Sequence, residues 1–552
     1  KIPLDDKNIF ELLSTGETTG LFQLESSGVR LALKQMRPNK FEDIIALVAL
    51  YRPGPMNNIS IYNDCKNGLK KPDYIHESLE KILKPTYGII IYQEQVMQIA
   101  QVLAGFTAGE ADVLRRAMGK KKRKELEKQR ERFISGAASN GISKDIASFI
   151  FQKIEPFAQY GFNKSHAAAY AMIAYQTAYL KYYHKENFIA ATMSSELSST
   201  DKLREFVEEL KRLNIEIVRP NINKCFADFK AEHNKIYYAL SGIKSVGYEA
   251  ISNIIREREK NGAFKSLDDF INRARPKDIN KLQLEGLVKA GAFDELETNR
   301  SSLLNSIPRL IQMNKSIFDE KDSNQNNLFS ENSNEKTVIF NLEKIQQWSN
   351  NELLMNEFRS IGFYMSDHPL KIYKDYFNKS KVVSFKDFVN GSENSALVAG
   401  TIMSIQEKKS AKGTSFAIVK FSDLKSEFEL FLFSDLLITN RDKLKIANSF
   451  ILTLQKDNSN NSATTRRINI RNINSLSNFT DKIFERVTIE INGKSDLNEL
   501  RNILKENGIT KIQIKVRKKS KIYTFSLKNT RKFSLSTFNH IKNKEYVKKI
   551  SF

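Results

Sequence analysis

The stretch Asp112-Val-Leu-Arg-Arg-Ala-Met-Gly-Lys-Lys-Lys122 places two adjacent arginines and three adjacent lysines around a single glycine. Between Arg115 and Arg132 the sequence has ten basic residues and three acidic ones, so the segment repels itself unless solvent or a polyanion neutralises it. Adjacent arginines suit phosphate oxygens, because a planar guanidinium can donate two parallel hydrogen bonds. A charged helix with one solvated face would show the same pattern, so the neighbouring motifs have to decide between these interpretations.

The composition of the whole chain is that of a large, basic, globular protein. Its 552 residues predict roughly three to five domains. We find no apolar stretch long enough for a membrane and no secretory signal pattern. Cys65 and Cys225 have no metal-ligand spacing, so we expect a reducing cytoplasm. A net charge of +23 favours nucleic acid as partner, although a lysine-rich low-GC genome would also raise it. Because the sequence starts at Lys1 and not at methionine, we expect a piece of a longer protein.

The first part of the chain, residues 1–210, is predicted to be mainly helical. Apolar residues recur at helical spacing over Ile91–Ala104, and Gly105 is expected to end that helix. A second long helix is predicted over Ala167–Phe188. Tyr51-Arg-Pro-Gly-Pro55 predicts a rigid turn, because proline fixes its own backbone and restricts the residue before it.

Two glycine turns follow in a smaller helical region. Leu240-Ser-Gly-Ile-Lys-Ser-Val-Gly247 opens onto a predicted helix at Tyr248–Glu259, which is the pattern of a helix-hairpin-helix. Such a turn presents backbone N–H groups and a helix N-terminus to a DNA phosphate. Leu287–Phe293 is interpreted as its tandem partner, while a plain connection between helices is the alternative for both. The DNA-binding candidates in the first turn are Gly242, Lys244 and Gly247.

A polar segment at residues 313–345 is rich in Asn, Ser, Lys and Glu, and we expect a flexible linker there. Inside it, Gln325-Asn-Asn-Leu-Phe329 has the pattern of peptides that dock on sliding clamps. Leu328 and Phe329 would fill an apolar pocket, and Gln325 would form a hydrogen bond beside it. Chance is the alternative, because so short a pattern recurs often, but a solvated linker has little other reason to expose Leu-Phe.

The pattern then changes to strands. Ala396–Ile405, Phe416–Phe421 and Phe428–Phe433 alternate apolar and polar residues, which predicts an OB-fold over residues 394–475. Such folds commonly bind single-stranded nucleic acid. Phe416, Phe421 and Phe431 are candidates for stacking on bases, although some of them must belong to the core. Residues 511–552 carry thirteen Lys or Arg and one acidic residue, and alternate like strands in places.

Long blocks of the sequence resemble one family. In chain order they are Thr18–Ser26, Phe41–Pro55, Pro85–Met97, Leu114–Lys122, Tyr160–Tyr170 and Ile361–Leu370. The last two read Tyr-Gly-Phe-Asn-Lys-Ser-His-Ala-Ala-Ala-Tyr and Ile-Gly-Phe-Tyr-Met-Ser-Asp-His-Pro-Leu. The chain resembles the C-terminal half of the α subunit of bacterial DNA polymerase III, a C-family DNA-directed DNA polymerase. The likeness is strong over residues 1–300, good to about residue 435 and weak beyond 480.

The resemblance implies a multidomain α+β protein, with helical fingers and a helix-hairpin-helix region before a β-barrel OB-fold and a small α/β C-terminal domain. The implied boundaries are fingers at 1–210, tandem helix-hairpin-helix at 211–312, a linker with the clamp motif at 313–350, a connecting segment at 351–393, the OB-fold at 394–475 and a C-terminal domain at 476–552. In the family the C-terminal domain binds the clamp-loader τ subunit, so the resemblance implies τ binding by residues 476–552.

The resemblance also assigns roles at the active site. Arg115 and Arg116 resemble the contacts to the triphosphate of the incoming dNTP, and Lys164 and His166 are expected to face the same cleft. For His166 the alternative is a helix-start residue whose hydrogen bonds are satisfied by backbone. Lys120, Lys121 and Lys122 are expected to touch the template or primer backbone.

No catalytic or metal-binding residue is expected in this chain. In the family two Mg²⁺ ions are held by aspartates of the palm domain, which precedes the fingers. The sequence shows no Asp-x-Asp that could replace them, and Asp5-Asp6 would point apart on a strand. We therefore expect this piece alone to be inactive. The expected partners are primer–template DNA, dNTP, the β sliding clamp, the τ subunit and a proofreading exonuclease bound through the absent N-terminal half.

Two other classes of function remain open. A truncated protein that holds DNA and the clamp without catalysis would share every site except the active one. A structural or ribosome-associated basic protein would not show the ordered polymerase blocks.

Overall fold

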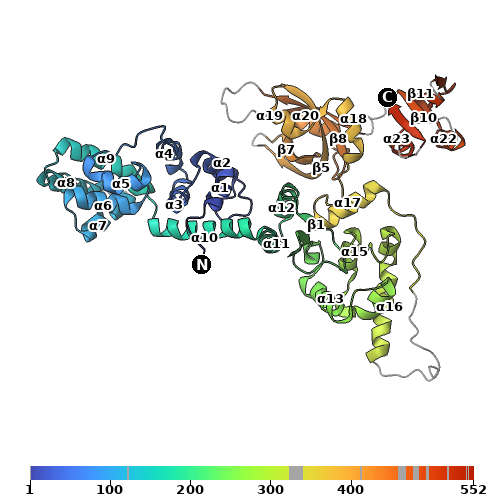
Figure 1. Cartoon of the computed structure of the whole chain (residues 1–552), viewed down its shortest axis with the longest axis horizontal. Helices are drawn as coiled ribbons and strands as arrows, with labels where there is room; N and C mark the ends of the chain where they lie inside the picture. The colour runs from blue at the N-terminus through green and yellow to red at the C-terminus, as the bar shows by residue number, and fades with distance from the viewer. Residues whose placement is uncertain are drawn as a thin grey trace. The chain divides into compact units, whose positions relative to one another are not determined.

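The computed structural model describes residues 2–120, 123–322, 340–410, 413–457, 468–476, 484–492, 497–518, 521–542, 544 and 546–551. Over these residues the protein is a mixed α+β protein, helical at first and then built on two larger sheets (Figure 1). It divides into two compact units. The first contains Lys1–Leu287, Ala292–Thr298 and Ile307–Phe340, and the second contains Val288–Gly291, Asn299–Ser306 and Asn341–Phe552.

The N-terminal part of the first unit is helical. Its helices are α1 (Lys7–Thr15), α2 (Ser27–Met36), α3 (Phe41–Leu50), α4 (Ile59–Lys66), α5 (Glu80–Leu83), α6 (Gln93–Ala104), α7 (Ala108–Lys120), α8 (Arg123–Ser139), α9 (Lys144–Tyr160), α10 (Lys164–Tyr183), α11 (Lys185–Ser195) and α12 (Thr200–Arg212). One apolar core joins α1–α4 to α10, and a second core lies among α5–α9. The first residues of the chain lie beside α10 (Figure 1), where the Asp6 amide donates to the Tyr175 hydroxyl at 3.2 Å.

The two predicted long helices are both present, with different bounds. Helix α6 ends at Ala104 as predicted, because Gly105 takes a left-handed conformation with φ 64°. The bounds predicted for α10 are wrong at both ends. The helix begins earlier because Asn163 caps it, accepting a hydrogen bond from the His166 amide at 2.9 Å. It ends at Tyr183 because the backbone of His184 leaves helical geometry.

The remainder of the first unit leads into the glycine turns. A small sheet of order β1-β3-β2 contains β1 (Glu216–Val218), β2 (Lys230–Glu232) and β3 (Lys235–Tyr237). After it come η4 (Leu240–Gly242), α13 (Tyr248–Asn261), α14 (Leu267–Arg273), η5 (Pro276–Asp278), α15 (Lys281–Lys289) and α16 (Arg300–Asp322). The first turn opens directly onto α13, as predicted. The second does not open directly onto a helix, because Gly291 follows the end of α15 with φ 81° and α16 starts only at Arg300.

The predicted strands of the second unit are confirmed, but their sheet is not a closed barrel. The elements are α17 (Asn350–Ile361), α18 (Lys374–Lys379), β4 (Val382–Val383), α19 (Phe385–Asn390), β5 (Ser395–Lys409), β6 (Ser415–Ser422), β7 (Glu427–Leu432), α20 (Ser434–Asn440), β8 (Ser449–Lys456) and β9 (Ile468–Ser475). The strand order is β7-β6-β5-β8-β9, with β4 beside β5. Among the described residues β7 and β9 lie near each other without pairing, so the ladder stays open. The prediction of a β-barrel is corrected accordingly.

The chain ends in a small α/β domain. It contains β10 (Arg486–Asn492), α22 (Leu497–Ile503), β11 (Asn507–Lys518), β12 (Lys521–Ser526), α23 (Leu535–Lys542) and β13 (Val547–Ser551). The sheet order is β12-β11-β10-β13, and β10 and β11 are parallel. Its core combines side chains of β10 and β11 with side chains of both helices. The strand-like alternation near the C-terminus is therefore real.

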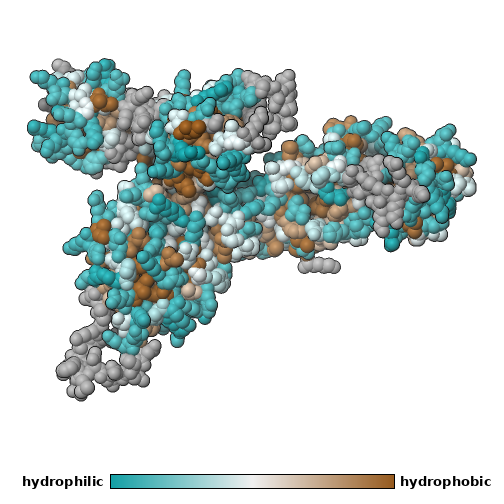
Figure 2. Space-filling view, turned by 180° about the vertical axis from the view of Figure 1, so that it is seen from behind, coloured by the Kyte–Doolittle hydropathy of each residue, from teal (hydrophilic) through white to brown (hydrophobic). Residues whose placement is uncertain are grey.

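In the part of the chain that the structure describes, none of the helices combines the length and the apolar character that a membrane crossing needs. In the space-filling view, apolar residues form small separate brown areas on a mostly teal surface (Figure 2).

Candidate nucleotide- and DNA-binding sites

Two segments that are far apart in the sequence meet at the start of α6. The Gln93 amide donates to the Phe162 carbonyl at 3.0 Å, and the Phe162 amide donates to the Ile91 carbonyl at 3.1 Å. The Glu94 carboxylate then accepts hydrogen bonds from the Asn163 side chain at 2.9 Å and from the Lys164 amide at 3.0 Å. A carboxylate is favourable at a helix N-terminus, where backbone N–H groups lack partners. These contacts fix the start of α10 against the start of α6.

A single carboxylate on α7 holds both candidate arginines. Arg115 donates to Asp112 Oδ1 from Nε at 2.9 Å and from Nη2 at 2.7 Å, while Arg116 Nη2 lies 2.7 Å from Asp112 Oδ2. The hydrogen bond from Arg115 is the main cause that lowers the pKa of Asp112 below its ordinary value. The Arg115 side chain is 27% exposed and that of Arg116 is 65% exposed. Both guanidinium groups are thus oriented in advance, and Arg116 is the more accessible.

The same corner brings Arg115 close to the start of α10. Arg115 Nη1 donates to Gln93 Oε1 at 3.3 Å, and Gln93 is the residue next to the Glu94 that caps Lys164. The side chain of Lys164 is exposed, and its Nζ lies 5.5 Å from the centre of the Tyr92 ring. The structure therefore gathers Arg115, Arg116 and Lys164 around the N-terminus of α6. We call this arrangement the cationic corner.

His166 lies at the edge of the cationic corner. Its amide donates to the Asn163 side chain that caps α10, and the residue is exposed. The ring packs at a tilt against those of Phe162 and Tyr170, with centroid distances of 5.4 Å and 4.5 Å. The side chain is therefore held in place while it stays open to solvent.

Sequence reasoning missed Arg52, which packs against Phe162 beside the cationic corner. Its guanidinium carbon lies 4.3 Å from the centre of the Phe162 ring, and its Nε donates to the Ala49 carbonyl at 2.9 Å. Gly54, two residues later, has φ 96°, which favours glycine and re-aims the chain after α3. The Arg-Pro-Gly-Pro turn was the available signal, because it marks a rigid backbone that can position the arginine before it.

The first glycine turn is packed tightly against α15. A Cβ on Gly286 would lie 2.6 Å from the Lys244 carbonyl oxygen, so only glycine lets the helix approach this closely. Lys244 and Gly247 are exposed, and Gly247 precedes the first turn of α13 without a side-chain cap. Gly242 is buried and its amide donates to the Ala239 carbonyl at 3.0 Å, so it shapes the turn and has no amide to offer a phosphate.

Comparison with known proteins identifies the family. Residues 1–141 match the model of the bacterial DNA polymerase III alpha subunit finger domain, and residues 214–303 match a helix-hairpin-helix motif. The chain is 42% identical over 448 residues to the DNA polymerase III subunit alpha of Caulobacter vibrioides, covering 81% of this chain and 39% of that protein. It is 41% identical over 442 residues to the DNA polymerase III subunit alpha of Borreliella burgdorferi, covering 79% of this chain and 38% of that protein. The chain belongs to the DNA polymerase III α subunit family.

The DNA polymerase III subunit alpha of Chlamydia muridarum is 39% identical over 496 residues, covering 87% of this chain and 39% of that protein. The chain thus spans about two fifths of the length of the curated relatives that it matches. The cationic corner includes Arg115 and Arg116, which fall within the residues matched by the finger model, and the glycine turn falls within the helix-hairpin-helix match.

Of the basic residues predicted to touch DNA, Lys120 is the last residue of α7. Lys121 and Lys122 lie outside the described residues, and so do the predicted clamp-binding residues Gln325, Leu328 and Phe329.

Three aromatic side chains lie together on the solvent-facing side of the β5–β9 sheet, namely Phe416, Phe431 and Phe433. Phe421 is fully buried in the core and cannot stack on a base. Phe431 is exposed, its ring centre lies 6.3 Å from that of the half-buried Phe416, and the exposed Phe433 lies 6.5 Å beyond it. The candidates for base stacking are therefore Phe416 and Phe431, and Phe433 joins them.

The described residues do not form a magnesium site. Within the described ranges, no three His, Cys, Asp or Glu side chains gather where a metal ion could be held. Asp6 instead caps α1, accepting from the Asn8 amide at 2.9 Å and from the Tyr183 hydroxyl at 2.7 Å. The residues present thus do not fit the ions that a polymerase reaction requires.

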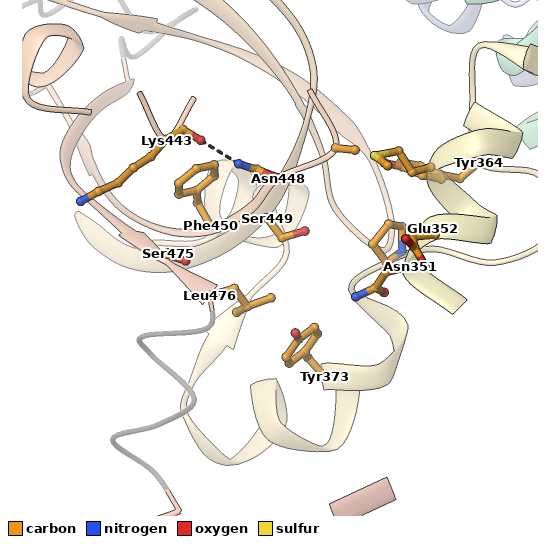
Figure 3. Close-up of a pocket in the computed structure, with 13 residues that line it drawn as sticks. Asn351, Glu352, Tyr364, Tyr373, Lys443, Asn448, Ser449, Phe450, Ser475 and Leu476 are labelled. Carbon is orange, nitrogen blue, oxygen red and sulfur yellow. Dashed lines mark hydrogen bonds between the residues drawn. The ribbon is translucent and has the colours of Figure 1, made fainter. Parts of the chain in front are cut away.

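A pocket of about 530 Å³ lies where the segment after α17 meets the ends of β8 and β9 (Figure 3). Tyr364, Tyr373, Phe450 and Leu476 give it apolar walls, and burial raises the pKa of the Tyr364 phenol. Asn448 donates from its side chain to the Lys443 carbonyl at 2.9 Å. The polar groups do not converge on one point, so we assign no chemistry to this pocket.

Proposed function

We propose that this chain is a part of a replicative DNA-directed DNA polymerase that includes the fingers and the helix-hairpin-helix region. The observation that carries the proposal is the cationic corner, where Arg115, Arg116 and Lys164 come from two different segments and present positive charge at one place. A triphosphate is the substrate group that such a cluster fits, because guanidinium and ammonium groups neutralise phosphate oxygens.

The proposed reaction is phosphoryl transfer. The primer 3′-hydroxyl attacks the α-phosphate of a dNTP, and pyrophosphate leaves. Arg115 and Arg116 would stabilise the charge that builds up on the leaving phosphates, in an orientation fixed by Asp112 and Gln93. Lys164 would bind phosphate beside them, and His166 would donate a hydrogen bond or a proton to it. Two Mg²⁺ ions would be held by aspartates outside this chain.

Duplex DNA would be bound at the glycine turn. Lys244 and Gly247 are exposed beside the uncapped start of α13, which suits a phosphate of the backbone. The basic residues Lys120, Lys121 and Lys122 would touch the template or primer strand. This mode of binding needs little base readout, so it predicts a steep salt dependence and little sequence preference.

The remaining assignments are proposals that rest on the sequence patterns. The sheet of β5–β9 would be an OB-fold whose Phe416 and Phe431 stack on single-stranded template. Gln325, Leu328 and Phe329 would dock on the β sliding clamp, and residues 476–552 would bind the τ subunit. A proofreading exonuclease would bind through a part of the subunit outside this chain. The protein would act in the cytoplasm, where the chromosome is copied.

A second candidate function is a DNA- and clamp-binding protein without catalysis, which would share every proposed site except the active one. Primer extension by this chain with Mg²⁺ and dNTPs, with and without a separately expressed palm domain of the same subunit, separates the two. Extension only in the presence of the palm supports the polymerase. No extension in either case, together with salt-sensitive DNA binding, supports the non-catalytic protein, and extension by the chain alone contradicts both.

A further inference from the structure

The C-terminal domain, whose residues 476–552 are proposed to bind the τ subunit, also contains an open groove to which no ligand has yet been assigned. The groove measures about 920 Å³ and lies between α22 and the strands β11 and β12. Half-buried Ile514 and Val516 line its floor, and Phe525 and Leu527 line the side formed by β12. The groove is therefore apolar at its base and open to solvent above.

The strand register places a second aromatic ring beside this groove. Ile514 pairs with Phe525 and Val516 pairs with Tyr523, and paired residues point to the same face of a sheet. Tyr523 is 47% exposed and Phe525 is 56% exposed. The helices cover the β10 side of this face, where the core lies, and leave the side of β12 uncovered. Two neighbouring exposed aromatic rings on an outer strand are costly unless a ligand covers them.

The charge around the groove is positive. Its charged lining residues are Arg501, Lys505 and Arg531. Two carboxylates of the same region are already neutralised, because Glu499 lies 2.5 Å from Lys544 and Glu506 lies 2.8 Å from Lys532. Residues 511–552 carry thirteen basic side chains and one acidic side chain. An anionic ligand is therefore favoured over a neutral or cationic one.

We propose that this groove binds single-stranded nucleic acid, with bases stacked on Tyr523 and Phe525 and phosphates held by Arg501, Lys505 and Arg531. Rings flanked by cations are the combination that single strands require, because every base has a face that can stack and every nucleotide carries a negative charge. A duplex would not satisfy the rings, since its bases are already stacked on one another. A purely acidic peptide would satisfy the cations but would leave the rings exposed.

A tryptophan reporter tests the proposal at this site alone, even though the chain has other DNA-binding surfaces. The sequence has one tryptophan, Trp348, so Trp348→Phe gives a silent background in the full 552-residue chain. Phe525→Trp then places the reporter in the groove. Titration with a short oligothymidylate should quench its fluorescence saturably, because a stacked base quenches the indole.

The matched control is Ile522→Trp in the same background. Ile522 is 51% exposed, but it points to the opposite face of β12 from Tyr523 and Phe525. This reporter should not respond to the oligothymidylate. Equal quenching at both positions would mean that the strand associates without using the groove, and this would overturn the proposal. Fluorescence anisotropy of a labelled oligothymidylate gives the concentrations at which the chain as a whole is bound, and no quenching of Phe525→Trp there would also overturn it.

Two further arms test the phosphate contacts and the competing ligand. Arg501→Glu plus Lys505→Glu should lower the slope of the logarithm of affinity against the logarithm of salt by about 1.4, since each single-strand phosphate contact contributes ~0.7. An unchanged slope would refute phosphate binding by these residues. Poly-L-glutamate should not quench Phe525→Trp. If it quenches at lower concentration than the oligothymidylate and displaces it, the groove takes an acidic protein segment and the proposal is wrong.

Discussion

Replacing Arg52 with alanine should weaken nucleotide binding, although Arg52 is not one of the proposed phosphate ligands. Its guanidinium lies against the ring of Phe162 at 4.3 Å. Phe162 is followed directly by Asn163, which caps α10, and by Lys164. The loss of Arg52 should therefore loosen the residues that hold the cationic corner together.

The magnitude can be worked from two of the contacts that Arg52 would lose. A partly desolvated cation–π contact is worth about 0.5–2 kcal/mol, and the hydrogen bond from Arg52 to the Ala49 carbonyl is worth about 0.5–1.5 kcal/mol. The free energy of unfolding should thus fall by about 1–3.5 kcal/mol. If all of this energy supports the cationic corner, the KM for dNTP rises by at most roughly 300-fold. The kcat should change less, because Arg52 does not touch the reacting atoms.

Thermal unfolding of this chain, followed by circular dichroism, measures the first effect, and steady-state kinetics of the complete α subunit measure the second. Arg52→Lys should not restore either value, because an ammonium group cannot stack as a planar guanidinium does. Arg256→Ala is the matched control, since it removes an exposed arginine from the middle of α13. A lower Tm with an unchanged KM would refute the positioning role, and an unchanged Tm would refute the contribution of the stacked pair.

Three further changes should have distinct effects. Gly286→Ala gains about 1 kcal/mol of helix propensity, but its Cβ would lie 2.6 Å from the Lys244 carbonyl oxygen. Because overpacking of about 1–3 kcal/mol should outweigh that gain, the Tm and the affinity for duplex DNA should both fall. A higher Tm would contradict the tight approach. Leu328→Ala plus Phe329→Ala in the complete subunit should abolish clamp-dependent processivity and leave distributive synthesis intact. An unchanged affinity for the clamp would refute this site. Asp112 has a lowered pKa in the folded protein. Its stabilising effect is therefore present at neutral pH and is lost as the pH falls through and below the ordinary value near 3.8. The free energy of unfolding, measured over this acid range, should depend less on pH in Asp112→Asn than in the unaltered chain.

Local patterns in the sequence were enough for the elements that carry strong periodicity. Gly105 ends α6 as predicted, because a left-handed residue is required there. The strands of the second unit were found from their alternation, and the turn before α13 was found from its glycines. The bounds of α10 were missed because one side-chain cap at Asn163 outweighed the apolar pattern.

The arrangement of the candidate site could not be read from the sequence. Gln93 and Arg115 are 22 positions apart, and no local rule predicts that they share a hydrogen bond. The buried amide of Gly242 and the buried ring of Phe421 were equally hidden, because a glycine turn or an alternating strand does not show which groups the rest of the fold covers. The open ladder between β7 and β9 depends on long-range pairing, which strand patterns alone do not fix.

The central claim is that Arg115 and Arg116 bind the triphosphate of the incoming nucleotide. Single-turnover incorporation of one dNTP by the complete α subunit, with Arg115→Ala plus Arg116→Ala, tests it most directly. Lys128→Ala plus Arg130→Ala is the matched control, because it removes two charges from the same basic run on α8. Two lost charge-assisted contacts of about 1.5–3 kcal/mol each predict that kcat/KM falls by about 10²- to 10⁴-fold, with the control near the unaltered enzyme. A double alanine variant whose kcat/KM matches that of the control would contradict the account.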